Sequence, residues 1–231
     1  MISALRKIQT WHFVAVLFFL FYSLFLTGCE QQERMPAADR AAEKPAYDGV
    51  IIAVGDSLTA GLGVAELEAY PALLERKLKK NGYNFQVINA GISGETSSGA
   101  LSRIGWIIAQ QPDIVILETG ANDGLRGIPL KVIYDNISKT VQLLKEGGVT
   151  VVLAGMQMLQ NLGPAYTREF AGLYQKVARE QDIILIPFFL QGVAGNPPLN
   201  QRDAIHPIAA GHRIIAETVY PYVLQAMKVG R

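Results

Sequence analysis

Residues 50–59, Val-Ile-Ile-Ala-Val-Gly-Asp-Ser-Leu-Thr, decide how the folded part of this chain is organised. The first five, Val50–Val54, are apolar and mostly β-branched, which is typical of a parallel strand covered on both faces. A glycine and then polar residues follow at once, so the strand ends where the chain turns. Ser57 is therefore predicted at the carboxyl edge of a parallel sheet, where ligands bind in such folds.

The same pattern of a short apolar run followed by a longer amphipathic stretch recurs along the chain. The predicted strands are Val50–Val54, Phe85–Asn89, Ile114–Glu118, Val149–Ala154 and Ile183–Pro187. The predicted helices are Tyr70–Asn81, Ser97–Gln110, Leu130–Glu146, Ala165–Gln181 and Ile208–Lys228. Strands that alternate with helices predict an α/β fold with three layers, α/β/α, and a five-stranded parallel sheet in flavodoxin-like order. We find neither an internal repeat nor a second domain.

Polar residues and glycines follow the second and third predicted strands. Asn89–Thr96 contains Gly94, and Glu118–Gly124 contains Asn122. Glycines let backbone N–H groups approach a ligand, and an asparagine at a strand end offers an amide donor. These segments also fit ordinary turns, in which Ser57 or Thr96 caps a helix and Asn122 forms an Asx turn.

Asp203-Ala204-Ile205-His206 supplies an acid three residues before a histidine. A carboxylate in that position can accept the Nδ1 proton and leave Nε2 free as a base. The alternative is a loop with a surface histidine. Of the other two histidines, His12 lies in the N-terminal apolar segment, and His212 lies in the last predicted helix without an acid three residues earlier. We therefore favour His206 as the base and assign His212 a structural place.

Four segments resemble, in order, the four blocks of the SGNH/GDSL serine hydrolase family: Gly55–Leu58, Gly94, Gly120–Asp123 and Asp203–His206. The resemblance extends over Val50–Tyr222. Three further stretches are similar to bacterial periplasmic acyl-CoA thioesterase/lysophospholipase and arylesterase members: Asn89–Thr96, Gly120–Gly127 and Gly163–Tyr166.

The resemblance implies the SGNH hydrolase fold and a role for each matching residue. Ser57 would attack the acyl carbon, His206 would act as base and then acid, and Asp203 would orient the imidazole. The oxyanion hole would consist of the backbone N–H groups of Ser57 and Gly94 and the side-chain amide of Asn122. The resemblance implies neither a metal nor an organic cofactor. The expected partner is a small-molecule acyl ester or thioester.

Two acids and several apolar residues near the same edge receive other assignments. Asp56 and Asp123 are expected to brace loops rather than to react. An acyl pocket is expected from apolar residues near the strand ends, for which ordinary core packing is the alternative: Leu58, Leu62, Leu125, Ile128, Met156 and Met158. The segment Met158–Asn161 departs from close relatives, which often have prolines there, so chain-length preference is not transferred.

The first 28 residues are interpreted as a lipoprotein signal peptide. Basic Arg6 and Lys7 precede an apolar run, Phe13–Leu26, and residues 26–29, Leu-Thr-Gly-Cys, resemble a bacterial lipobox. Cys29 is the predicted lipidation site, and this single cysteine excludes an intramolecular disulfide. The alternatives are an uncleaved anchor, for which the run falls short of about 20 apolar residues, and an ordinary signal peptide.

Polar, proline-containing residues 29–47 are predicted to form a flexible tether, and residues 48–231 the hydrolase domain. The protein is then expected in the cell envelope, anchored to the membrane and facing the periplasm. Glu30 after the cysteine favours the outer membrane in a Gram-negative cell. The chain has 21 basic and 20 acidic residues, which gives no case for nucleic-acid binding. We expect a monomer.

The sequence leaves three functions in competition. The favoured one is hydrolysis of carboxylic esters or thioesters through an acyl-Ser57 intermediate. A carbohydrate O-acetylesterase would use the same triad with a smaller, more polar pocket. A non-catalytic envelope lipoprotein that binds acyl chains is the third, and the complete set of Ser57, Asp203 and His206 argues against it.

Overall fold

The structure is a computed structural model that describes residues 47–158 and 162–229. Its sheet has five strands in the order β2-β1-β3-β4-β5, and all neighbouring strands are parallel. The strands are β1 (Gly49–Gly55), β2 (Phe85–Gly91), β3 (Ile114–Glu118), β4 (Thr150–Ala154) and β5 (Ile184–Ile186). The predicted α/β class and the flavodoxin-like order are confirmed.

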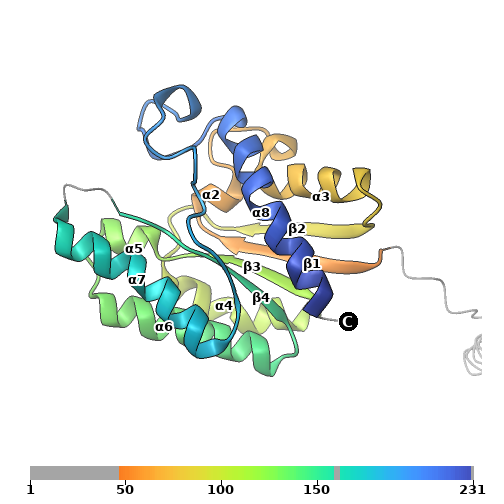
Figure 1. Cartoon of the computed structure of the whole chain (residues 1–231), viewed down its shortest axis with the longest axis horizontal. Helices are drawn as coiled ribbons and strands as arrows, with labels where there is room; N and C mark the ends of the chain where they lie inside the picture. Colours follow the sequence, from red (N-terminus) through yellow and green to blue (C-terminus); the bar gives the residue numbers. More distant parts are fainter. Residues whose placement is uncertain (1–46, 159–161, 230–231) are drawn as a thin grey trace, which may run out of the picture. The chain divides into compact units, whose positions relative to one another are not determined.

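Helices cover both faces of the sheet (Figure 1). On one face, α3 (Tyr70–Lys80) packs against α8 (Ala209–Val229). On the other face, α4 (Ser97–Ala109) packs against α6 (Leu130–Glu146), and α6 packs against α7 (Pro164–Gln181). Because β1 and β3 lie inside the sheet between these layers, their side chains form the centre of the core, and every residue of β3 is buried.

The predicted elements agree with the structure within one or two residues at each end. The last helix, for example, begins at Ala209, because Pro207 pairs with Asn200 in an isolated antiparallel bridge before it. Within the described residues, four short helical segments have no counterpart in the prediction: α2 (Ser57–Ala60), η1 (Glu66–Glu68), α5 (Ala121–Leu125) and η3 (Pro197–Leu199). With three to five residues each, they are too short for helical periodicity to indicate them.

The predicted signal peptide, Cys29 and the tether up to residue 46 lie outside the described residues, as does Leu159–Asn161 of the segment that departs from close relatives. Between residues 47 and 229, no described helix combines the length and the apolar character needed to span a bilayer.

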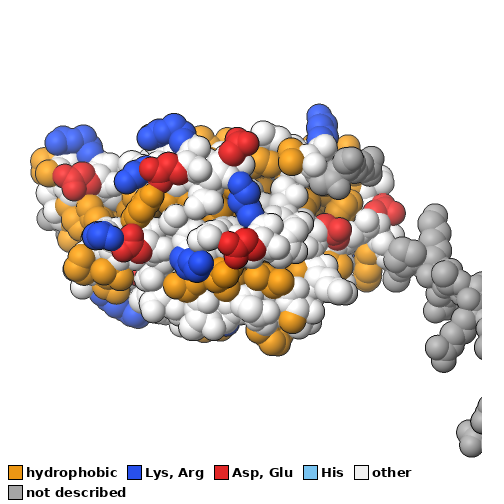
Figure 2. All heavy atoms as spheres, turned by 90° about the horizontal axis from the view of Figure 1, so that it is seen from below, with side chains coloured by type: hydrophobic (Ala, Val, Ile, Leu, Met, Phe, Trp, Pro, Cys, Tyr) orange, Lys and Arg blue, Asp and Glu red, His pale blue; other side chains and the backbone are white. Residues whose placement is uncertain are grey.

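On the face shown in Figure 2, basic and acidic side chains are interspersed between apolar ones. Oppositely charged side chains pair along the described helices, such as Lys131 with Asp135 on α6 and Lys176 with Glu180 on α7.

Candidate active site

Ser57 lies at the first position of α2, directly after β1. Asp56 caps this short helix, since its Oδ1 accepts a hydrogen bond from the Leu58 N–H at 2.9 Å. The chain then leaves the helix through Gly61, which has the left-handed φ of +80° that glycine adopts without strain. The turn holds Ser57 at the carboxyl edge of the sheet with 7% of its surface exposed.

Ser57, His206 and Asp203 form one continuous chain of hydrogen bonds. The Ser57 Oγ lies 2.9 Å from the His206 Nε2, and the His206 Nδ1 lies 2.7 Å from the Asp203 Oδ2. The structure therefore brings together the three side chains that the sequence singled out. An imidazole held between a hydroxyl and a carboxylate is the arrangement that activates a serine for attack.

The turn that presents His206 is held together by Asp203. The Asp203 Oδ1 accepts hydrogen bonds from the backbone N–H groups of Ile205 and His206, at 2.9 and 3.0 Å. The N–H of His206, the His206 ring and the N–H of Ile205 together hold the pKa of Asp203 well below its usual range. The carboxylate therefore stays ionised and keeps its acceptor role toward the imidazole.

Gly94, in the loop between β2 and α4, faces open space. It has a φ of +80°, and among the described residues beyond its chain neighbours, the atom nearest to the position that a Cβ would occupy is Nη2 of Arg126, at 3.7 Å. That guanidinium donates to the Gly94 carbonyl at 3.0 Å. Among the described residues, no acceptor is assigned to the backbone N–H of either Ser57 or Gly94, so both donors are available to a ligand.

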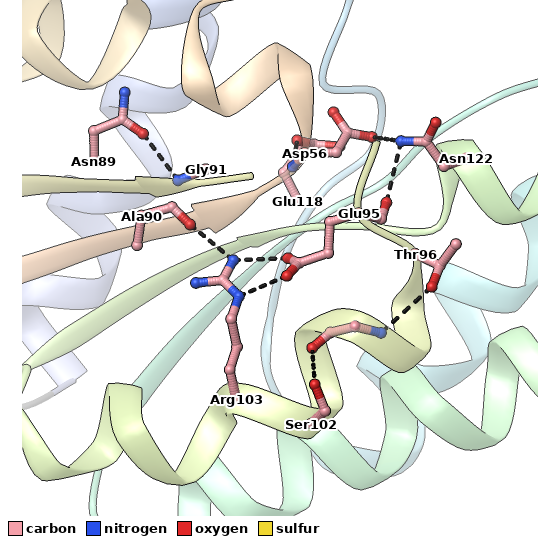
Figure 3. A network of polar contacts seen from close by, with 11 residues as sticks. Asp56, Asn89, Ala90, Gly91, Glu95, Thr96, Ser102, Arg103, Glu118 and Asn122 are labelled. Atoms are coloured by element: carbon pink, nitrogen blue, oxygen red, sulfur yellow. Dashed lines mark hydrogen bonds and ion pairs between the residues drawn. The ribbon is translucent and has the colours of Figure 1, made fainter. Parts of the chain in front are cut away.

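Asn122, in α5, is tied into the same loops (Figure 3). Its Nδ2 donates to the Asp56 Oδ2 at 2.9 Å and to the backbone carbonyl of Glu95 at 3.1 Å. Asn122 thus links the loop of Ser57 to the loop of Gly94. Both of its N–H groups are engaged, which the sequence did not indicate.

A largely buried ion pair, also missed by the sequence, fixes the Gly94 loop to α4 (Figure 3). Arg103 donates to both carboxylate oxygens of Glu95 at 2.7 Å and to the Ala90 carbonyl at 2.7 Å. A bidentate pair of this kind holds both side chains in one geometry. The glycine and the helix therefore keep a fixed relative position.

Sequence reasoning also missed Glu118, which lies at the end of β3. Its side chain is fully buried, and its Oε2 accepts hydrogen bonds from the Asp56 N–H at 3.1 Å and the Thr59 hydroxyl at 2.9 Å. Burial raises the pKa of Glu118 well above its usual range, and the neighbouring Asp56 charge raises it further. Burial also raises the pKa of Asp56, although the N–H of Leu58 opposes this.

The remaining polar residues support loops and helices. Asp123 accepts hydrogen bonds from the Ser97 N–H at 2.8 Å and the Ser97 hydroxyl at 2.6 Å, and so braces the start of α4. His212 is buried in α8, where its Nδ1 accepts the Tyr70 N–H at 3.3 Å. Asp56 and Asp123 therefore make the bracing contacts expected of them, and His212 packs between helices.

The apolar residues assigned to an acyl pocket have different environments. Leu58, Met156 and Met158 are buried in the core, Ile128 is half-buried, and Leu62 and Leu125 are exposed. The pocket remains a prediction, carried mainly by the two exposed leucines. Among the described residues, no group of three or more His, Cys, Asp or Glu side chains could hold a metal ion.

A doubly wound sheet that carries a Ser–His–Asp chain at its carboxyl edge defines the class as a serine hydrolase. Residues 53–214 match the GDSL-like Lipase/Acylhydrolase family. The chain belongs to this family.

Named relatives agree with this assignment. Esterase TesA of Pseudomonas aeruginosa is 39% identical over 172 residues, which cover 74% of this chain and 86% of the relative. Thioesterase 1/protease 1/lysophospholipase L1 of Escherichia coli is 35% identical over 168 residues, 72% of this chain and 79% of the relative. A crystal structure of TesA has a TM-score of 0.75 and 38% identity, and the match covers 77% of this chain and 99% of that chain.

Proposed function

We propose that Ser57 is the nucleophile of this hydrolase, that His206 is its general base and acid, and that Asp203 orients His206. Ser57 Oγ attacks the acyl carbon while Nε2 takes its proton, and the leaving alcohol or thiol departs with that proton. Water then attacks the acyl-Ser57 ester, releases the carboxylic acid and restores the serine. The chain of hydrogen bonds through Ser57, His206 and Asp203 is the observation that carries this proposal.

The same proposal assigns the oxyanion hole to Ser57, Gly94 and Asn122. The unengaged backbone N–H groups of Ser57 and Gly94 support the first two donors. The Asn122 amide joins them by exchanging its bond to the Glu95 carbonyl for one to the substrate oxygen, while Asp56 continues to hold it. Donors placed in advance around the developing negative oxygen stabilise the transition state.

We further propose that the substrates are amphiphilic acyl esters and thioesters. The names of the two relatives, an esterase and a thioesterase/lysophospholipase, support this class. The exposed Leu62 and Leu125 offer apolar surface in segments that adjoin the nucleophile and oxyanion loops. A carbohydrate O-acetylesterase would instead need a small polar pocket, so the two readings differ in how the rate depends on acyl length.

The lipid anchor on Cys29 belongs to the proposal as well. It rests on the lipobox-like residues 26–29 and on the polar tether that follows. Several acyl chains, each contributing about 0.8 kcal/mol per buried CH₂, suffice for stable anchoring. The monomeric enzyme would act in the periplasm, on the outer membrane of a Gram-negative cell.

The experiment that tests the mechanism compares wild type, Ser57→Ala and the surface control Ser98→Ala on p-nitrophenyl acetate. Ser57→Ala is expected to lose up to about 10⁶-fold in kcat, and Ser98→Ala to behave as wild type. A fluorophosphonate probe should label wild type and the control but not Ser57→Ala. Wild-type turnover by Ser57→Ala would refute the mechanism.

A panel of acyl-CoA, lysophospholipid, aryl ester and acetylated sugar substrates tests the substrate class. Within an ester series from acetyl to long acyl, kcat/KM should rise with chain length. A steep preference for acetyl would overturn the amphiphile proposal and support the O-acetylesterase.

A further inference from the structure

The glycine of the nucleophile turn is tightly enclosed by Glu118 and Thr59. A Cβ built on Gly55 would lie 2.2 Å from the Thr59 Oγ1 and 2.5 Å from the Glu118 Oε2. Both distances are shorter than any real contact, so the Glu118 side chain occupies the space directly behind the turn. Position 55 therefore has no room for a side chain, because the carboxyl group of Glu118 on the neighbouring strand fills part of that space.

The two oxygens of Glu118 differ in their partners. Oε2 accepts from the Asp56 N–H and the Thr59 hydroxyl, whereas Oε1 is buried and has no hydrogen-bond donor among the described residues. An ionised carboxylate with one oxygen buried and unpaired is costly, while a protonated oxygen becomes a donor. The acidic neighbour of Glu118 is Asp56, whose N–H donates to Oε2 and whose carboxylate accepts from Leu58 and Asn122.

We propose that Glu118 is a positioning residue that remains protonated at neutral pH and donates that proton to Asp56. This proposal rests on the function proposed above. A neutral Glu118 leaves the charge on Asp56, which then caps the helix of Ser57 and holds the Asn122 amide (Figure 3). The buried proton on Glu118 thereby holds Ser57 and Asn122 in fixed positions relative to each other.

The groups around Glu118 support this placement of the proton. Burial raises the pKa of both acids, but it raises that of Glu118 well above its usual range, whereas the N–H of Leu58 and the amide of Asn122 oppose the rise at Asp56. The proton therefore resides on Glu118. Tyr70 and Tyr174 face the same interior, and burial raises the pKa of both phenols, so both remain neutral. Two further charges have smaller effects: His206 acts to lower the pKa of Asp56, and Asp123 acts to raise the pKa of Tyr174.

Infrared difference spectroscopy tests the proton directly and needs no catalysis. The spectrum of wild type minus Glu118→Gln at pH 7 should contain the carbonyl band of a protonated carboxylic acid. The control, wild type minus Glu146→Gln, removes an exposed carboxyl and should show only the bands of an ionised carboxylate. A Glu118 difference spectrum with only ionised bands would overturn the proposal, whether or not Ser57 is the nucleophile.

Kinetics on an aryl ester test the positioning. Glu118→Gln keeps a neutral side chain with one donor and one acceptor, so kcat should stay within about threefold of wild type. Glu118→Leu leaves the Asp56 N–H without an acceptor and the Thr59 hydroxyl with only the Tyr70 hydroxyl at 3.5 Å, and kcat should fall about 10-fold or more at unchanged KM. If a folded Glu118→Gln protein loses as much kcat as Glu118→Leu, the ionised form is required and the proposal fails.

Discussion

Both carboxylate oxygens of Asp203 bind His206. Oδ2 contacts the ring Nδ1 at 2.7 Å, and Oδ1 accepts the backbone N–H of the same residue at 3.0 Å. The carboxylate thus fixes the histidine at two points, although 45% of the Asp203 side chain is exposed. Solvent weakens the electrostatic part of the contact, but the paired geometry keeps the imidazole aimed at Ser57.

Replacing Asp203 with asparagine should therefore reduce kcat strongly without unfolding the protein. The amide oxygen can still accept the backbone N–H groups, but it cannot support the imidazolium with a negative charge. We expect kcat to fall about 10³–10⁴-fold and KM to change little. Steady-state kinetics on an aryl ester measure this, with Asp182→Asn as the surface control. A loss below tenfold would show that the acid is dispensable.

The turn between Asp203 and His206 leads to a prediction about the stability of the protein. Ala204 has a φ of +60°, a left-handed conformation that costs an alanine roughly 1 kcal/mol and costs glycine almost nothing. Ala204→Gly should therefore raise the free energy of unfolding by up to about 1 kcal/mol, less the added entropy of the unfolded chain. Urea denaturation measures the change. A lower midpoint would mean that the alanine methyl makes contacts worth more than the strain.

The sequence indicated the triad by position, and the resemblance to the SGNH/GDSL family assigned the roles. Ser57 follows a buried strand, and Asp203 and His206 share one short turn, but each segment by itself also fitted an ordinary turn or loop. The partners of Glu118 could not be predicted in the same way. A glutamate at the end of β3 looks like any polar strand end, and only the packing of β3 against β1 places its carboxyl behind Gly55.

The ion pair between Glu95 and Arg103 escaped prediction for a related reason. The two residues are eight positions apart, across a loop and the first turns of α4, so no helical spacing pairs them.

The acyl pocket was the weakest expectation, since an apolar residue near a strand end fits a core as well as a cavity. Met156 and Met158 indeed lie in the core.

Asn122 connects two loops, so its removal should affect turnover and stability differently. Asn122→Ala deletes a proposed oxyanion donor, and kcat should fall roughly 10²–10³-fold. It also leaves the Glu95 carbonyl and the Asp56 carboxylate without that donor, which should lower the free energy of unfolding by about 1–2 kcal/mol. Parallel kinetics and urea denaturation separate the effects. A loss of stability with unchanged kcat would limit Asn122 to bracing.

The proposed anchor gives a prediction for the full-length protein in cells. Cys29→Ser removes the thiol that the diacylglycerol would modify, so labelled palmitate should no longer enter the protein. The purified domain should keep wild-type kcat. Palmitate incorporation into Cys29→Ser would contradict the lipobox interpretation.

His212 predicts how stability changes in weak acid. Burial lowers its pKa from 6.5 to about 4, partly opposed by the charge of Glu68. The folded protein therefore keeps the imidazole neutral while the unfolded chain begins to bind a proton below pH 6.5. The free energy of unfolding should fall as the pH drops from 7 toward 4, and this residue should account for about 2 kcal/mol between pH 7.5 and 5.

The matched variant for this effect is His212→Asn. Its amide oxygen can still accept the Tyr70 N–H that the His212 Nδ1 accepts, but the side chain does not titrate. Urea denaturation of both proteins at pH 7.5 and 5 isolates the residue, since every other titrating group is shared. The acid-induced loss should be about 2 kcal/mol smaller in His212→Asn than in wild type. Equal losses would mean that the folded protein accommodates the imidazolium, so that burial does not keep the imidazole neutral.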